Sequence, residues 1–101
     1  MSKFRHVVMF RYVEGATAEQ RAALLDGLSR LPSQVPEIRG YHFGEDVGLV
    51  DGNYDLVIIA EFDNIGDYRS YVANAQHQEL IAAHIVPVVA VRSAVQFEMP
   101  G

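Results

Sequence analysis

The sequence contains no cysteine among its 101 residues, which excludes disulfide bonds, thiol nucleophiles and zinc sites built from thiolates. A chain without cysteine is indifferent to cytosolic reducing conditions, so we expect a cytoplasmic location. No apolar run approaches the roughly 20 residues of a membrane span. His6 and Arg11 also interrupt the N-terminal segment, which therefore does not resemble a signal peptide. We expect neither membrane insertion nor secretion by the usual route.

Signatures of several common function classes are also missing. The eight Lys and Arg residues are scattered and outnumbered by 13 Asp and Glu, giving a net charge of -5, so we expect no nucleic-acid partner. Gly44, Gly48 and Gly52 recur every four residues, which suits bends between strands better than a phosphate-binding loop. No serine lies in a nucleophile-elbow sequence. Nucleotide binding and serine hydrolase chemistry therefore have no support.

The composition, 50% hydrophobic and 21% charged, is typical of one compact domain, here spanning residues 1–101. Residues 3–13 alternate with period two, which predicts a strand. Thr17 and Gln20 match a capping box and predict a helix over 18–31 that ends before Pro32. Further strands are predicted over 38–44, 54–62 and 93–99, and further helices over 65–72 and 76–85.

The order of these elements is that of an α+β, ferredoxin-like split βαβ domain, in which helices cover one face of an antiparallel four-stranded sheet. The strand over 54–62 is nevertheless apolar on both faces, because Val57 and Ile59 alternate with the side chains assigned to the core. Val7 and Met9 add to this second apolar surface. An uncovered apolar face predicts a homodimer with the two sheets packed face to face, and the alternative is a monomer with single exposed apolar residues.

Three side chains able to handle protons, His6, Tyr71 and His77, are predicted to meet on the helix-covered side of the sheet. Convergent polar groups in an otherwise apolar wall are typical of a small-molecule pocket. The apolar residues predicted to contact the ligand are Phe10, Leu24, Leu28, Ile58 and Phe62. The partners expected from the sequence are therefore a second copy of the chain and a small molecule.

These residue types support a specific chemistry. A histidine can remove a proton next to a carbonyl, and a tyrosine hydroxyl can donate to the developing enolate oxygen. In this hypothesis His77 is the base, Tyr71 is the donor, and His6 orients the substrate or His77. The alternative is that His6 and Tyr71 only pack and satisfy their own hydrogen bonds. His42 and His84 complete the four histidines, but the i, i+4 spacing of metal ligands is absent, so no metal or other cofactor is expected.

Five stretches of sequence occur in the order seen in a known family. They are residues 6–10, 35–38, 43–47, 54–62, and 67–71 followed by His77. Together they resemble the stress-responsive dimeric α/β-barrel family, called Dabb, over nearly the whole chain. The resemblance implies a ferredoxin-like protomer whose sheet closes a barrel across a homodimer. It also implies mixed functions, since some members are plant stress-induced proteins and one, olivetolic acid cyclase, carries out an intramolecular aldol condensation followed by loss of water.

The same resemblance implies site residues. The cyclase pattern of a histidine in the first strand, a tyrosine in the short helix and a histidine six residues later corresponds to His6, Tyr71 and His77. Asn74 and Ala75 replace a His-Pro pair of the family, which predicts a looser start of the helix that carries His77.

Two functions remain open. The first is a pocket protein that binds or converts an apolar oxygenated molecule by a cyclase-like aldol or proton-transfer reaction. The second is a non-catalytic stress-response protein that acts through its stable dimer. Fold analogy alone adds cofactor-free monooxygenases and haem-degrading enzymes.

Overall fold

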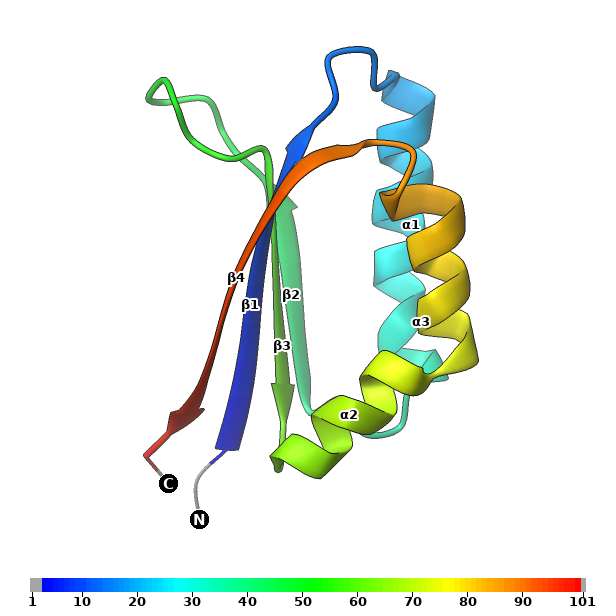
Figure 1. Ribbon diagram of the computed structural model, residues 1–101, viewed down its shortest axis with the longest axis vertical. Helices are drawn as coiled ribbons and strands as arrows, with labels where there is room; N and C mark the ends of the chain where they lie inside the picture. Colours follow the sequence, from blue (N-terminus) through cyan, green and yellow to red (C-terminus); the bar gives the residue numbers. More distant parts are fainter. Residues whose placement is uncertain (1–2, 101) are drawn as a thin grey trace.

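The computed structural model describes residues 3–100 as one antiparallel sheet covered on one face by helices (Figure 1). The elements are β1 (Lys3–Tyr12), α1 (Ala18–Gln34), β2 (Gly40–Glu45), β3 (Leu56–Phe62), α2 (Ile65–Ala73), α3 (Ala75–Leu80), the π-helical turn η1 (Ile81–Ile85) and β4 (Val89–Met99). The strand order is β2-β3-β1-β4, and all neighbouring strands are antiparallel. The predicted ferredoxin-like α+β fold is confirmed.

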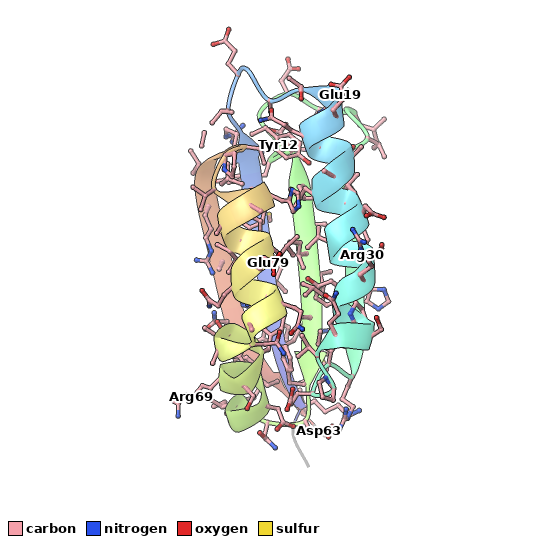
Figure 2. The ribbon with its side chains drawn as sticks, turned by 90° about the vertical axis from the view of Figure 1, so that its right-hand side faces the viewer. Tyr12, Glu19, Arg30, Asp63, Arg69 and Glu79 are labelled. Carbon is pink, nitrogen blue, oxygen red and sulfur yellow. The ribbon has the colours of Figure 1, made fainter. Side chains whose placement is uncertain are left out.

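The helices cover the face that the period-two pattern makes apolar. β1 buries every second side chain between residues 4 and 10, and β3 does the same between residues 56 and 62. From α1, the buried side chains of Leu24, Leu28 and Leu31 complete this layer at helical spacing. Figure 2 shows α1 and α3 running side by side over the sheet. No helix between residues 3 and 100 is long and apolar enough to cross a membrane.

Helix α1 starts where the sequence predicts but ends later. The Thr17 hydroxyl accepts a hydrogen bond from the Gln20 backbone N–H at 3.1 Å, and the Gln20 side chain accepts from the Thr17 N–H at 2.9 Å, so the capping box is confirmed. The predicted end before Pro32 is wrong. Proline lacks an N–H donor, but the helical hydrogen bonds continue beyond Pro32, since the Val35 N–H donates to the Leu31 carbonyl at 2.9 Å.

The other boundaries also move, for identifiable reasons. β4 begins at residue 89 rather than 93, because it pairs along the whole length of β1. The helix predicted over 76–85 divides into α3 and η1, since the Val86 N–H donates to the Ile81 carbonyl, five residues earlier, at 2.9 Å. β2 and β3 begin at residues 40 and 56, after the turn residues that precede them.

The opposite face of the sheet carries no helix (Figure 1). The strand register places on this outer face Val7, Met9, Val57, Ile59, Val91, Val95 and Phe97. The three residues from β4 were not assigned to it from the sequence. The loop of residues 46–55 leans over the same side and exposes Val47, Leu49 and Val50. The structure thus confirms the predicted uncovered apolar face and extends it.

Candidate functional site

A cavity of about 220 Å³ lies between the sheet and the helices α2, α3 and η1. The polar residues in its wall are His6, Tyr68, Tyr71, His77 and Arg92. The structure therefore brings the three predicted proton-handling residues together on the helix-covered side of the sheet.

The apolar wall contains only part of the predicted set. Phe10, Leu28 and Ile58 line the cavity, together with aliphatic side chains of α3 and η1. Leu24 and Phe62 do not line it, because both are 0% exposed and lie within the closed core. Both side chains therefore pack in the core and do not face the cavity.

Asn74 sets the relative position of Tyr71 and His77 at the junction of α2 and α3. Its side-chain oxygen accepts hydrogen bonds from the backbone N–H groups of Gln76 and His77 at 2.9 and 3.2 Å. The backbone N–H of Asn74 donates to the Tyr71 carbonyl at 3.2 Å. Asn74 therefore acts as the N-cap of α3, in place of the His-Pro pair of the family.

The polar groups stand within an aromatic cluster. The rings of Tyr71 and His77 are in contact at a tilt, with centroids 4.0 Å apart and an interplanar angle of 31°. The Tyr71 hydroxyl lies 3.5 Å from the Tyr41 hydroxyl. Tyr68 covers the His6 ring with centroids 5.1 Å apart. These contacts limit the rotation of each ring and hold the site in one arrangement.

Gln96 on β4 fixes the other side of His6. Its side-chain nitrogen lies 3.1 Å from His6 Nδ1 and 3.0 Å from the Tyr68 hydroxyl oxygen. With the amide nitrogen on this side, His6 Nδ1 accepts a hydrogen bond and the ring hydrogen resides on Nε2. By contrast, Nδ1 of His77 is buried without a hydrogen-bond partner among residues 3–100.

Burial controls the protonation of the site. It lowers the pKa of His6 to about 4, and the charges of Arg92 and His77 act in the same direction. Burial also lowers the pKa of His77, opposed by the backbone carbonyls of Val72 and Tyr71. Burial raises the pKa of Tyr71. At neutral pH the site therefore holds two neutral imidazoles, which can accept protons, and one protonated phenol, which can donate one.

We expect the stability of the protein to fall as the pH drops from about 6.5 towards 4. The pKa of His6 is about 4 in the folded protein, against 6.5 for a free histidine, so the unfolded chain binds more protons in this window. This contribution to stability is complete above about pH 6.5, and one such group changes it by at most about 1.4 kcal/mol per pH unit. Urea denaturation at pH 7, 6 and 5 measures the slope.

The His6→Gln variant should show a shallower slope than the wild type, whereas His84→Gln, outside the cavity, should keep it. Equal slopes in wild type and His6→Gln would contradict the assignment to His6.

The remaining histidines do not join the site. His42 is exposed and pairs with Ile59 in the register of β2 and β3, which places it on the outer face. His84 is half-buried in η1, beside a groove that also contains Gly27 of α1. Among residues 3–100, no group of three or more His, Cys, Asp or Glu side chains is arranged to hold a metal ion.

Sequence analysis missed two polar residues of the cavity wall, Tyr68 and Arg92, and the aliphatic residues that α2, α3 and η1 contribute to it. Tyr68 lies three residues before Tyr71 on the same helix face, and this spacing is a signal that could have identified it. Arg92 faces the cavity because it pairs with Phe10 across β1 and β4. That register joins distant parts of the chain and has no local sequence signal.

Comparison with known proteins identifies the family. The family model for the stress responsive A/B barrel domain, Dabb, matches residues 4–99. A dimeric ferredoxin-like protein of unknown function from Thermobifida fusca is 37% identical with a TM-score of 0.89, over 97% of this chain and 92% of that one. A stress-response A/B barrel domain-containing protein of Arabidopsis thaliana is 25% identical, covering 93% of this chain and 94% of its own. The hydroxynitrile lyase of Passiflora edulis shares the fold at 17% identity, with a TM-score of 0.84 over 97% and 96% of the two chains. The chain therefore belongs to the Dabb family of stress-responsive A/B barrel domains.

Proposed function

We propose that this protein is a homodimer that binds a small, apolar, oxygenated molecule in the cavity of His6, Tyr71 and His77 and transfers a proton on it without a cofactor. The observation that carries the proposal is the meeting of these three groups in one apolar cavity. Its volume of about 220 Å³ is below the roughly 300–1,000 Å³ of pockets for drug-sized ligands. The ligand is therefore about the size of one substituted aromatic ring.

The proposed roles follow from protonation. His77 is neutral at pH 7, because burial lowers its pKa, and can take a proton from the carbon next to a carbonyl. Tyr71 stays protonated and donates a hydrogen bond to the oxygen that gains charge in this step. In this proposal His6, held by Gln96 at Nδ1, orients the ligand. Phe10, Leu28 and Ile58 supply the apolar contacts.

The homodimer is supported by the outer face of the sheet. Met9 and Val95 are 37% and 64% exposed there, and Phe97 is 42% exposed, which is unusual for a sheet face of a soluble monomer. A hollow of about 360 Å³ separates the loop of residues 46–55 from this face. In a two-fold symmetric pair the exposed loop side chains of each protomer can fill the hollow of the other. The T. fusca relative is dimeric. The cytoplasmic location stays a prediction from composition.

The second candidate is a non-catalytic stress-response protein that acts through its dimer. The pKa of His6 favours it, because a group with a pKa of about 4 is a weak base at neutral pH. Enzymatic chemistry is favoured instead by the Passiflora protein of the same fold, a lyase, by analogy of fold alone.

Ligand binding tests the proposal directly. We expect acetophenone, benzaldehyde or phenol, added at millimolar concentration, to shift the imidazole NMR signals of His6 and His77 but not those of His42. The His77→Ala variant should abolish proton exchange at the methyl group of acetophenone, or weaken its binding, because the base is lost. His84→Ala is the matched control outside the cavity.

Thermal denaturation of His77→Ala separates a functional from a structural role. His77 is 8% exposed and its ring contacts that of Tyr71, so its removal should lower the unfolding midpoint, but by less than about 8 °C, since it lines a cavity and its Nδ1 makes no hydrogen bond with residues 3–100. A decrease of more than about 8 °C, roughly one to two kcal/mol for a domain of this size, would make His77 a structural residue and favour the second candidate.

A further inference from the structure

Arg92 is the one cationic side chain in the described cavity wall, and the proposed reaction of His6, Tyr71 and His77 gives it no role. We propose that Arg92 binds the carboxylate of the ligand, so that the substrate class is a small aromatic or short apolar monocarboxylic acid. This inference rests on the proposed function, in which a small molecule binds in the cavity, and adds that this molecule carries a carboxylate.

The position of Arg92 on the sheet is the first support. It pairs with Phe10 of β1, which places its side chain on the helix-covered face together with Gln96, four residues further along β4. Arg92 lines the cavity but is itself exposed, so it stands at the mouth. Four residues along a strand span about 13 Å, so Arg92 and the Gln96–His6 pair stand at different levels along the sheet.

The charge of Arg92 reaches the polar groups inside. It lowers the pKa of His6 and also acts to lower that of Tyr71, against the effect of burial. A ligand whose anionic end contacts Arg92 can therefore place its body beside the rings of Tyr71 and His77.

The lack of a partner for the Arg92 guanidinium is the second support. Four of the six other arginines pair with carboxylates, and Arg11 donates to the backbone carbonyls of Gly52 and Asn53. The four that form ion pairs are Arg5, Arg21, Arg30 and Arg39. The Arg92 guanidinium makes no hydrogen bond or ion pair with any residue between 3 and 100, although acidic side chains outnumber basic ones 13 to eight in the chain. No acidic side chain lines the cavity. An unpaired guanidinium at the mouth of a pocket without acids favours an anionic ligand.

The chemistry of the site favours a carboxylate over a phosphate. The planar guanidinium matches the two oxygens of a carboxylate with two parallel hydrogen bonds. Phosphate sites usually add a glycine-rich turn or several backbone N–H groups, and the cavity wall contains no glycine. The apolar lining from Phe10, Leu28 and Ile58 then suits a largely apolar body that carries the single charged group at one end and, further in, the carbonyl of the proposed proton transfer.

The test compares benzoate with benzamide, which has the same shape without the charge. By NMR titration of the wild-type protein at pH 7 we expect benzoate to bind at least ten times more tightly than benzamide. Bound benzoate should also raise the imidazole pKa of His6, because a carboxylate at the mouth partly offsets the charge of Arg92. Inorganic phosphate at the same concentration should leave these signals unchanged.

The Arg92→Gln variant should lose at least tenfold in benzoate affinity and none in benzamide affinity, and Arg92→Lys should fall between wild type and Arg92→Gln. Arg69→Gln is the matched control, because Arg69 is an exposed arginine of α2 whose side chain points away from the molecule (Figure 2).

Equal affinity of the wild type for benzoate and benzamide, or equal benzoate affinity of Arg92→Gln and wild type, would overturn the inference. If acetophenone binds in the cavity while benzoate does not, the carboxylate proposal fails and the proposed pocket function stands. If acetophenone, benzaldehyde, phenol, benzamide and benzoate all leave the His6 and His77 signals unchanged, both fail.

Discussion

The Ile59→Lys variant is expected to sediment as a monomer at micromolar concentrations at which the wild-type protein sediments as a dimer. Ile59 lies on β3, one of the two central strands, and pairs with Val7 on one side and His42 on the other. A lysine there would place a charge in the middle of the apolar outer face. Two-fold symmetry puts two such charges into each dimer, and burying a polar group costs about 1–3 kcal/mol in proteins. Association should therefore weaken by roughly 10² to 10⁴-fold.

Ile65→Lys provides the matched control for this experiment. Ile65 is 40% exposed at the start of α2, away from the outer face, so the same change there should leave the dimer intact. Circular dichroism distinguishes a folded monomer from an unfolded chain. If Ile59→Lys is unfolded, the unfolding midpoint of the wild type should rise with protein concentration, as in an obligate dimer. A wild-type protein that is monomeric at micromolar concentration would refute the interface.

The Phe62→Ala variant should be the least stable single substitution in the core. Phe62 is 0% exposed, and its ring centroid lies 5.1 Å from that of Tyr71 and 5.8 Å from that of Tyr68. Truncating a buried phenylalanine costs about 3–5 kcal/mol, because apolar contacts are lost and a cavity remains. For a domain of this length the unfolding midpoint should fall by roughly 15–30 °C. Differential scanning calorimetry measures this decrease.

Phe62→Leu should lie between wild type and Phe62→Ala, since it keeps most of the buried volume. The two variants also separate packing from ligand contact. A core residue changes stability strongly and affects ligand binding only through the loosened rings of Tyr68 and Tyr71. Near-normal stability with lost acetophenone binding would instead support the ligand contact that the sequence suggested for Phe62.

Local patterns account for most of the fold that the sequence predicted. Alternation with period two marks β1 and β3, because a strand presents successive side chains to opposite faces. Thr17 and Gln20 mark the start of α1, because their side chains bond the first free backbone groups of the helix. Pro32 was misleading, since α1 continues through it to Gln34. The π-helical hydrogen bond from Val86 to Ile81 has no comparable local pattern.

Some residues of the candidate site have a local sequence signal and others do not. His6 and Tyr71 could be assigned to the inner face from strand alternation and from the burial expected of an aromatic ring. Arg92 and Gln96 could not, because their orientation depends on the register between β1 and β4, which only the complete sheet fixes. Phe62 was assigned to the cavity because its strand face is correct. Its complete burial depends on α2, whose Tyr68 and Tyr71 pack against it, and strand alternation does not predict that contact.

The pairing of β1 with β4 also affects how the protein is made. His6 and Gln96 are 90 residues apart in sequence and adjacent in the sheet, and β1 is a central strand whose two neighbours both follow it by many residues. Contacts of such long sequence separation slow folding, because loop-closure entropy is lost before the contacts form. During synthesis the apolar side chains of β1 therefore stay uncovered until β4 has been made. The ligand cavity, which needs both strands, is completed among the last parts of the molecule, so chaperone dependence should concentrate in nascent chains that have not yet added β4.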